Sequence, residues 1–299
     1  MIKYEWRDQL STDESAQLAD LLRRAADYDA EPEYSTIDFA DVQEAMSTPG
    51  SRYRHLVVWM LPYATTLGGA DQPERIAGLI RLALHTDGTA EATGVIDPAL
   101  RSIGIMTLLF ERTGLNTAAP EGWLGTGAHT VTAWARGNHP ASGRISNRFL
   151  IARRRRVWKL IRSTDSFEDT AAAPVLESAS AGSLDDVGWA SPVSAAAGAS
   201  HILRDQGRIT GAVSIDFTPL SSEEFGVCAT VRAVATAPTH ADAHTRKQLL
   251  NGAAALAHEG GFTGLIIHVD SDDSPLVNAC RLADFQHDRT DVLLQLGGE

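Results

Sequence analysis

The sequence predicts an α/β protein built from two related halves, each with a mixed, mostly antiparallel sheet flanked by helices. The order of the predicted elements in the first half returns in the second half. The 299 residues are enough for two ordinary domains. A hydrophobic content of 43% and a charged content of 21% are typical of chains that bury full cores.

The first half alternates short β-branched runs with helical segments. Asp87-Gly88 separates two of these runs, and such a pair is typical of a hairpin turn. The predicted elements are, in order, a helix over 13–27, strands over 55–59, 75–84 and 89–96, a helix from about 103, a strand over 129–135, a helix from about 140 and a strand over 151–162.

The second half repeats this order with fewer elements at its start. Its predicted elements are strands over 201–204, 208–217 and 227–236, a helix over 242–258, a strand over 264–270, a helix over 275–283 and a closing strand over 291–296. The segment between the halves is rich in Ala, Ser, Asp and Gly, which indicates a linker. The predicted domains are residues 1–163, a linker and shortened domain start over 164–199, and residues 200–299.

Composition and charge exclude several classes of function. A net charge of −12 argues against nucleic-acid binding, which needs a basic surface. The sequence has no apolar stretch of about twenty residues, so we expect no membrane contact. The first residues lack the pattern of a signal peptide, so we expect a cytoplasmic protein. Cys228 and Cys280 are expected to be small core residues rather than a disulfide or zinc ligands.

One basic run stands out against the acidic background. Arg153–Arg156 lies in the last predicted strand of the first half. Charges on an exposed strand face or edge discourage aggregation, and we take this as the main interpretation. A contact between one or two of these arginines and a phosphate is the alternative.

The segment after the strand over 89–96 has the features of an anion site. The strand ends at Ile96, Pro98 turns the chain, and a basic loop with a glycine opens a helix. Unpaired N–H groups at a helix N-terminus suit a pyrophosphate, Gly104 permits close approach, and Arg101 can add a charge. An ordinary strand–turn–helix with a solvent-exposed arginine is the alternative.

This loop resembles the acetyl-CoA loop of the GNAT N-acetyltransferases, Val-x-Pro-x-x-Arg-x-x-Gly-x-Gly. The match runs from Ile96 to Gly104, and Met106 replaces the last glycine. The run from Trp134 to Ala141 is similar to the corresponding region of mycothiol synthases, which are tandem GNAT proteins. The resemblance implies two tandem GNAT domains, acetyl-CoA as a substrate and a small amine as acceptor. In that family the acceptor is the cysteinyl amine of a glucosaminyl-inositol thiol precursor.

The resemblance also implies roles for single residues. Glu91, on the strand before the loop, is the candidate catalytic base or a substrate contact, and a solvated strand residue is the alternative. Glu33, in the acidic segment after the first helix, is a candidate substrate contact. The candidate acetyl-CoA contacts are Gly94, Val95, Ile96, Arg101, Ser102, Ile103, Gly104, Ile105, Met106, Val234, Ala235 and Thr236.

The corresponding loop of the second half departs from the pattern. Ala241 stands at the place of the arginine, His244 and Arg246 at the places of glycines, and Asp242 would repel a pyrophosphate. His240 and His244 share a helical spacing, but no third ligand is evident, so we expect no metal. Two functions therefore compete: an N-acetyltransferase, and a non-catalytic acetyl-CoA-binding or scaffold protein. The sequence does not fix the oligomeric state, and a monomer is plausible.

Overall fold

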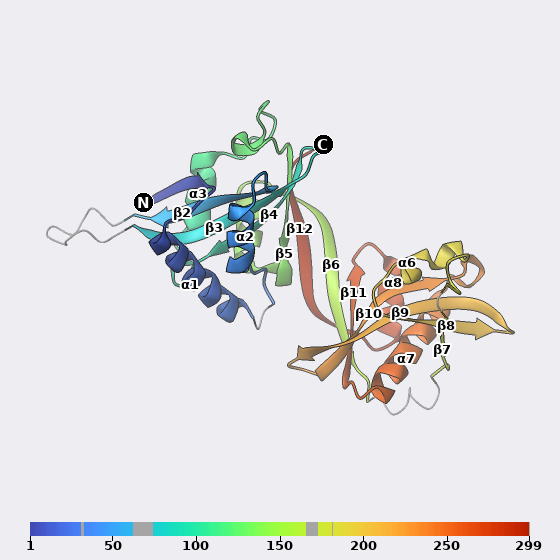
Figure 1. Ribbon diagram of the computed structural model, residues 1–299. Helices are drawn as coiled ribbons and strands as arrows, with labels where there is room; N and C mark the ends of the chain where they lie inside the picture. The colour runs from blue at the N-terminus through green and yellow to red at the C-terminus, as the bar shows by residue number, and fades with distance from the viewer. Residues whose placement is uncertain (31–32, 62–73, 166–172, 181, 299) are drawn as a thin grey trace. The chain divides into compact units, whose positions relative to one another are not determined.

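The computed structural model describes residues 1–299 except 31–32, 62–73, 166–172, 181 and 299 (Figure 1). The chain divides into two compact units. The first unit contains Met1–Arg155 and Asp291–Glu299, and the second contains Arg156–Thr290.

The first unit is a sheet with the strand order β1-β2-β3-β4-β5-β12. Neighbouring strands are antiparallel except β4 and β5, which are parallel. Its elements are β1 (Ile2–Arg7), α1 (Thr12–Asp29), α2 (Phe39–Ser47), β2 (Tyr53–Met60), β3 (Arg75–Leu84), β4 (Thr89–Ile96), α3 (Ile105–Thr113), β5 (Thr130–Ala135), α4 (Pro140–Arg148), the start of β6 (Ala152–Ser163) and the end of β12 (Gln286–Gly297).

Helices cover both faces of this sheet. A capping box of Ser11 and Glu14 starts α1, which packs with α2 on the face that carries Val57, Leu79 and Val95. Helix α3 packs on the opposite face, where alternate residues of the same strands are buried. Side chains of β4 therefore point alternately to the α1 and α2 side and to the α3 side.

The second unit has the strand order β6-β11-β10-β9-β8-β7, with β10 and β11 parallel and the other described pairs antiparallel. Helix α7 packs its buried face on the sheet and on α8 in one core. The elements are β7 (Glu177–Ser178), α6 (Ser191–Ser194), β8 (Ala199–Asp205), β9 (Arg208–Ser222), β10 (Gly226–Thr236), α7 (Ala243–Glu259), β11 (Gly264–Asp270) and α8 (Ser274–Leu282).

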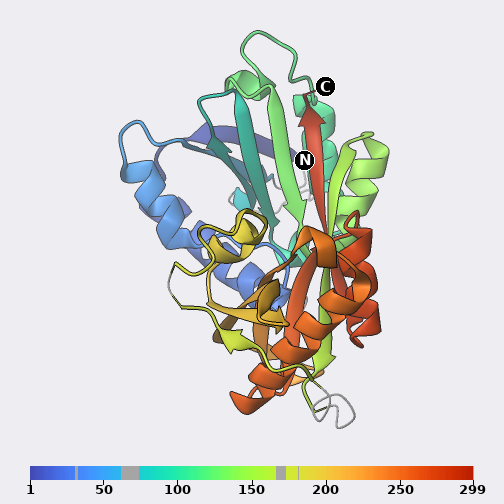
Figure 2. The same ribbon diagram turned by 90° about the vertical axis from the view of Figure 1, so that its right-hand side faces the viewer.

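The last strand of the chain belongs to the sheet of the first unit. Residues Val292–Gly297 of β12 pair with β5, and Figure 2 shows the two strands side by side. Strand β6, from Val157 onward, pairs instead with β11 of the second unit. The units therefore differ from the expected boundaries at 163 and 199. An alternating strand pattern fixes which face is buried but not which neighbour the strand pairs with, so the sequence could not show this exchange.

The sheet type, the helices on both faces and the burial of Cys228 and Cys280 confirm the predictions. The arginines of Arg153–Arg156 are exposed, as the main interpretation expects. Strand β1 and helix α2 were not predicted. No helix in the described part of the chain is long and apolar enough to span a membrane.

Buried His55 makes the stability of the chain sensitive to acid. Burial, with a smaller contribution from Arg81, lowers the pKa of His55 from 6.5 to about 4. The neutral form is therefore favoured in the folded state, so its stabilisation is complete above pH 6.5 and is lost as the pH falls toward 4. The shift corresponds to about 3 kcal/mol.

We predict that His55→Leu flattens this pH dependence. Urea unfolding of the wild type should give a lower free energy of unfolding at pH 4.5 than at pH 7, and the variant should show a clearly smaller difference. Equal differences for both proteins would contradict the assignment to His55.

Candidate functional site

Strands β4 and β5 separate at the centre of the first unit. They pair over only three residues of β4, from Thr89 to Glu91, whereas β4 stays paired with β3 as far as Ile96. The N–H of Asp97 donates to Ala77 O, so the odd-numbered residues of β4 bond to β3. The N–H groups of Gly94 and Ile96 therefore point toward the opening between β4 and β5.

A turn after β4 leads into the N-terminus of α3. Pro98–Leu100 forms a single 3₁₀ turn, and Ser102 then adopts a positive φ of 66°. Gly104, the N-cap of α3, has a φ of 87°, and a Cβ there would meet no atom within 4 Å, so the glycine is required by its backbone conformation and opens onto free space.

The first turn of α3 has no cap. Gly104 provides no side-chain hydrogen bond, and in the described part of the chain no acceptor is found for the backbone N–H groups of residues 102–107. These N–H groups carry the partial positive charge of a helix N-terminus. Together they form a place where an anion such as a phosphate can bind.

Asp97 holds this loop to the body of the unit. Its carboxylate is fully buried and accepts hydrogen bonds from Ala99 N at 3.0 Å, Arg24 Nη2 at 2.9 Å and Arg75 Nη2 at 2.5 Å. Burial alone would raise the pKa of Asp97, but these hydrogen bonds outweigh it and lower the pKa. The ionised carboxylate therefore fixes the loop to α1 and β3.

The structure places Arg101 differently from the expectation. Its guanidinium donates two hydrogen bonds to the Asp29 carboxylate at 2.6 and 2.7 Å, and its Nε donates to Ile96 O at 3.1 Å. This pairing with Asp29 raises the pKa of Arg101. The side chain thus ties the end of α1 to β4 and does not face the N-terminus of α3. Asp29 lies 72 positions earlier in the chain, so the motif gave no sign of this partner.

The two candidate carboxylates lie on the α1 and α2 side. Glu91 is the last residue of β4 that pairs with β5, its side chain is exposed, and it shares its face with Val95. Glu33 lies in the turn after α1 with a positive φ of 51°. Its neighbours Glu31 and Pro32 lie outside the described residues. Glu91 therefore lies at the point where the two strands part.

Five residues lie around the end of β5 on this side, and no motif of the sequence assigned a role to any of them. The ring of Tyr34 contacts the ring of His139 at 4.4 Å between centroids. The guanidinium of Arg136 lies over the ring of Trp134 at 4.6 Å, and Ser35 Oγ donates to Trp134 O at 3.4 Å. The connection between α1 and α2 therefore lies against the end of β5.

His139 is arranged as a hydrogen-bond donor. It caps α4, and its Nδ1 accepts the N–H of Ala141 at 3.1 Å. Burial lowers the pKa of His139, and the charge of nearby Arg101 adds to this effect. A neutral imidazole that accepts at Nδ1 carries its proton on Nε2. His139 therefore carries its proton on Nε2 and has no free lone pair with which to act as a base.

The second unit repeats the parting of strands. Strand β10 pairs with β11 only up to Val231, and its pairing with β9 shifts register between Val231 and Ala233. The N–H of Ala237 donates to Thr210 O, so the register directs the N–H groups of Val234 and Thr236 into the opening and that of Ala235 toward β9.

The helix that follows differs from α3 in its cap. The Asp242 carboxylate accepts the N–H of Thr245 at 2.8 Å and its hydroxyl at 3.1 Å, and Arg246 donates to Ala241 O at 2.9 Å. The backbone hydrogen bond lowers the pKa of Asp242, so the carboxylate is ionised. The N-terminus of α7 therefore already holds a negative charge of the chain itself. Within the described residues no group of three metal-binding side chains forms around His240 and His244.

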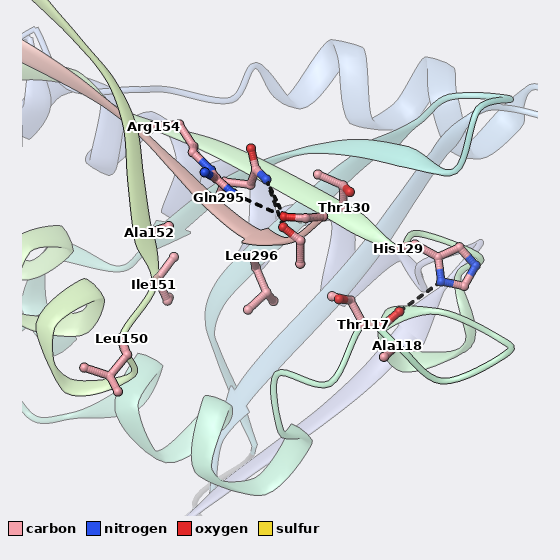
Figure 3. A pocket seen from close by; sticks show the side chains of 12 residues that line it. Thr117, Ala118, His129, Thr130, Leu150, Ile151, Ala152, Arg154, Gln295 and Leu296 are labelled. Atoms are coloured by element: carbon pink, nitrogen blue, oxygen red, sulfur yellow. Dashed lines mark hydrogen bonds between the residues drawn. The ribbon is translucent and has the colours of Figure 1, made fainter.

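Two cavities lie away from both openings. The larger, about 520 Å³, lies at the start of β5 and contains none of the candidate site residues; Figure 3 shows Arg154 and Gln295 on one side of it and His129 and Thr117 on another. The second, about 390 Å³, lies around Ser178–Ser180 and Ser200 of the second unit. The candidate site is thus defined by the backbone geometry of β4 and α3, and neither of these two cavities belongs to it.

Several solved GNAT proteins are similar to this structure. No protein-family model matches the chain, and no curated protein matches its sequence significantly. A tandem GNAT protein from the clavulanic acid biosynthesis pathway is 16% identical with a TM-score of 0.58 and full coverage of both chains. A GCN5-related N-acetyltransferase of Sphaerobacter thermophilus is 12% identical with a TM-score of 0.55, covering 98% of this chain and 95% of that one.

An acetyltransferase of the GNAT family from Colwellia psychrerythraea is 14% identical with a TM-score of 0.54, covering 98% of this chain and 99% of that one. These similarities extend over essentially the whole chain. They confirm the predicted tandem GNAT fold.

The contribution of the α7 cap to the stability of the second unit can be tested by mutation of Asp242. We predict that Asp242→Ala lowers the free energy of unfolding by about 1 kcal/mol, because the N–H of Thr245 loses its acceptor. Asp242→Asn retains an acceptor oxygen and should lose clearly less. Urea unfolding at pH 7 measures both, and equal losses would show that the cap does not act through this hydrogen bond.

Proposed function

We propose that the protein is an acetyl-CoA-dependent N-acetyltransferase whose transfer site lies in the first unit. One observation carries the proposal: α3 begins without a cap directly after a strand that has parted from its neighbour, while the equivalent helix α7 is capped by Asp242. Only the first of these helix N-termini has room for the pyrophosphate of acetyl-CoA.

The loop and β4 would contact different parts of acetyl-CoA. The N–H groups from Ser102 to Met106 would hold the pyrophosphate, and the open space at Gly104 allows its approach. The free edge of β4 at Gly94 and Ile96 would bind the pantetheine and polarise the thioester carbonyl through backbone N–H groups. Val95 is buried on the other face and supports the strand by packing.

Transfer then needs removal of a proton from the amine. Glu91, through a water, takes the proton from the acceptor nitrogen, which forms the new N–C bond at the thioester carbon. The C–S bond breaks and the CoA thiolate leaves. A thiol with a pKa near 8.5 is a tolerable leaving group, so the thiolate can leave without a side chain that protonates it.

The proposed acceptor is the cysteinyl amine of cysteinyl-glucosaminyl-inositol, which would give mycothiol. The run from Trp134 to Ala141, which resembles mycothiol synthases, forms the end of β5 and the start of α4 beside the opening. A cytoplasmic location belongs to the same proposal. The assignment departs from that family in one respect, since there the C-terminal half performs the transfer.

A second function is favoured by the position of Arg101. Its Nε hydrogen bond to Ile96 O engages the free edge of β4 that the pantetheine would use. In this alternative the contact competes with the pantetheine, and the protein binds acetyl-CoA weakly and acts as a scaffold. Cofactor binding without turnover would support this alternative.

The charge of the loop can be tested at Ile103, whose side chain is 56% exposed. We predict that Ile103→Glu weakens CoA binding by about tenfold or more, because a carboxylate next to the free N–H groups repels the pyrophosphate. Ile103→Gln has the same shape without the charge and should bind nearly as well as the wild type. Isothermal titration should give one CoA per chain. Equal affinities of the two variants would place the pyrophosphate elsewhere.

The role of Glu91 can be tested by turnover. Mass spectrometry should detect one acetyl group added to cysteinyl-glucosaminyl-inositol in the presence of acetyl-CoA. We predict that Glu91→Gln lowers kcat by about a hundredfold and leaves CoA affinity unchanged, because the amine keeps its proton. Asp87→Asn, at the turn before β4, is the matched control. Full activity of Glu91→Gln would remove Glu91 from the mechanism.

A further inference from the structure

The last strand of the chain supplies a buried carboxylate to the first unit. Asp291 is only 7% exposed, and its Oδ2 accepts Arg136 Nη1 at 2.6 Å while its Oδ1 accepts the backbone N–H of Gly137 at 2.9 Å. From the next residue, Val292, the strand pairs with β5. Asp291 thus reaches the turn between β5 and α4 from the opposite end of the sequence.

That turn has a backbone that needs support. Gly137 and Asn138 both have positive φ values, 60° and 49°, and Asn138 pays a steric cost in this region. The pair of hydrogen bonds to Asp291 holds Gly137 in place and keeps Arg136 over the ring of Trp134. A charged acceptor makes both bonds strong.

The turn sets the position of His139. His139 follows Asn138 directly, caps α4 and contacts the ring of Tyr34. The charged and titratable groups that affect it are Arg101, Asp29 and Arg144, in addition to Tyr34 at its ring face. Any movement of the turn therefore changes both the aromatic contact and the surroundings of the imidazole.

We propose that Asp291 is a positioning residue for the acceptor side of the first unit, acting through the turn at 136–138 on His139 and Trp134. The inference rests on the proposed function, because it assigns Trp134 and His139 to the side from which the amine approaches Glu91. It adds that the site is incomplete until the final strand has joined the first unit. The two hydrogen bonds described for Asp291 go to Arg136 and Gly137, outside α3 and its loop, so we expect the cofactor contacts not to depend on it.

The test compares Asp291→Asn with Asp288→Asn in the full chain. Asp288 lies on the same strand, pairs with Lys159 at 3.0 Å and belongs to the second unit. Asp288→Asn therefore removes a paired carboxylate from β12, as Asp291→Asn does, but leaves the turn at 136–138 unchanged. Steady-state kinetics with cysteinyl-glucosaminyl-inositol measures KM and kcat, titration calorimetry measures CoA affinity, and NMR follows the Hε1 titration of His139, assigned with His139→Gln.

For Asp291→Asn we expect KM for the amine to rise about tenfold, with CoA affinity within about twofold of the wild type. The pKa of His139 should move upward toward its ordinary value as the ring leaves its buried position. Asp288→Asn should change neither quantity.

An unchanged KM together with an unchanged His139 titration would overturn the proposal. So would a parallel loss of CoA affinity and kcat that Asp288→Asn also shows, because that pattern indicates only lower stability. Absence of acetyl transfer in the wild type would refute the proposed function alone. The His139 titration would then still decide whether Asp291 positions the turn.

Discussion

Strand β4 keeps β3 as a partner along its whole length but loses β5 after Glu91, and the rest of the first unit depends on this constraint. Backbone groups that leave a sheet must find other partners. The carbonyl of Ile96 accepts a hydrogen bond from Arg101 Nε. The backbone N–H groups of residues 102–107 have no acceptor among the described residues. Within the described part of the chain, the fold thus leaves donors without acceptors at the start of α3, and the proposed binding of acetyl-CoA depends on these donors.

The two units use the same parting of strands with opposite outcomes at the following helix. In the first, Gly104 takes a left-handed conformation and leaves the helix N-terminus open. In the second, Asp242 fills the equivalent position with its own carboxylate. A carboxylate stabilises the helix, and the same charge opposes a bound phosphate. Under the proposed function, the helix start of the second unit is stabilised by its own carboxylate, and that of the first unit is left open for a ligand.

Local signals made much of the fold predictable. The Asp-Gly turn before β4, the strand runs and the helix after Pro98 depend on neighbours in sequence, and so does the cap at Asp242, whose incompatibility with a phosphate could be stated from the sequence. The contacts of the site, in contrast, join residues that are far apart in sequence. Arg101 is held by Asp29, and Gly137 by Asp291, across 72 and 154 positions. No periodicity or motif encodes such pairs, because each partner looks like an ordinary surface charge.

The exchange of the last strand shows why this limit matters for function. A strand reaches the sheet of the first unit only after the second unit has been synthesised, yet it brings Asp291, which accepts hydrogen bonds from the half-buried N–H of Gly137 and from the guanidinium of Arg136 at the turn before α4. If the closing strand paired within its own half, the turn would lose both hydrogen bonds, and each of them is strengthened by the charge of the carboxylate. The geometry beside Glu91 is therefore a property of the complete chain, although every residue that carries the proposed chemistry lies in its first half.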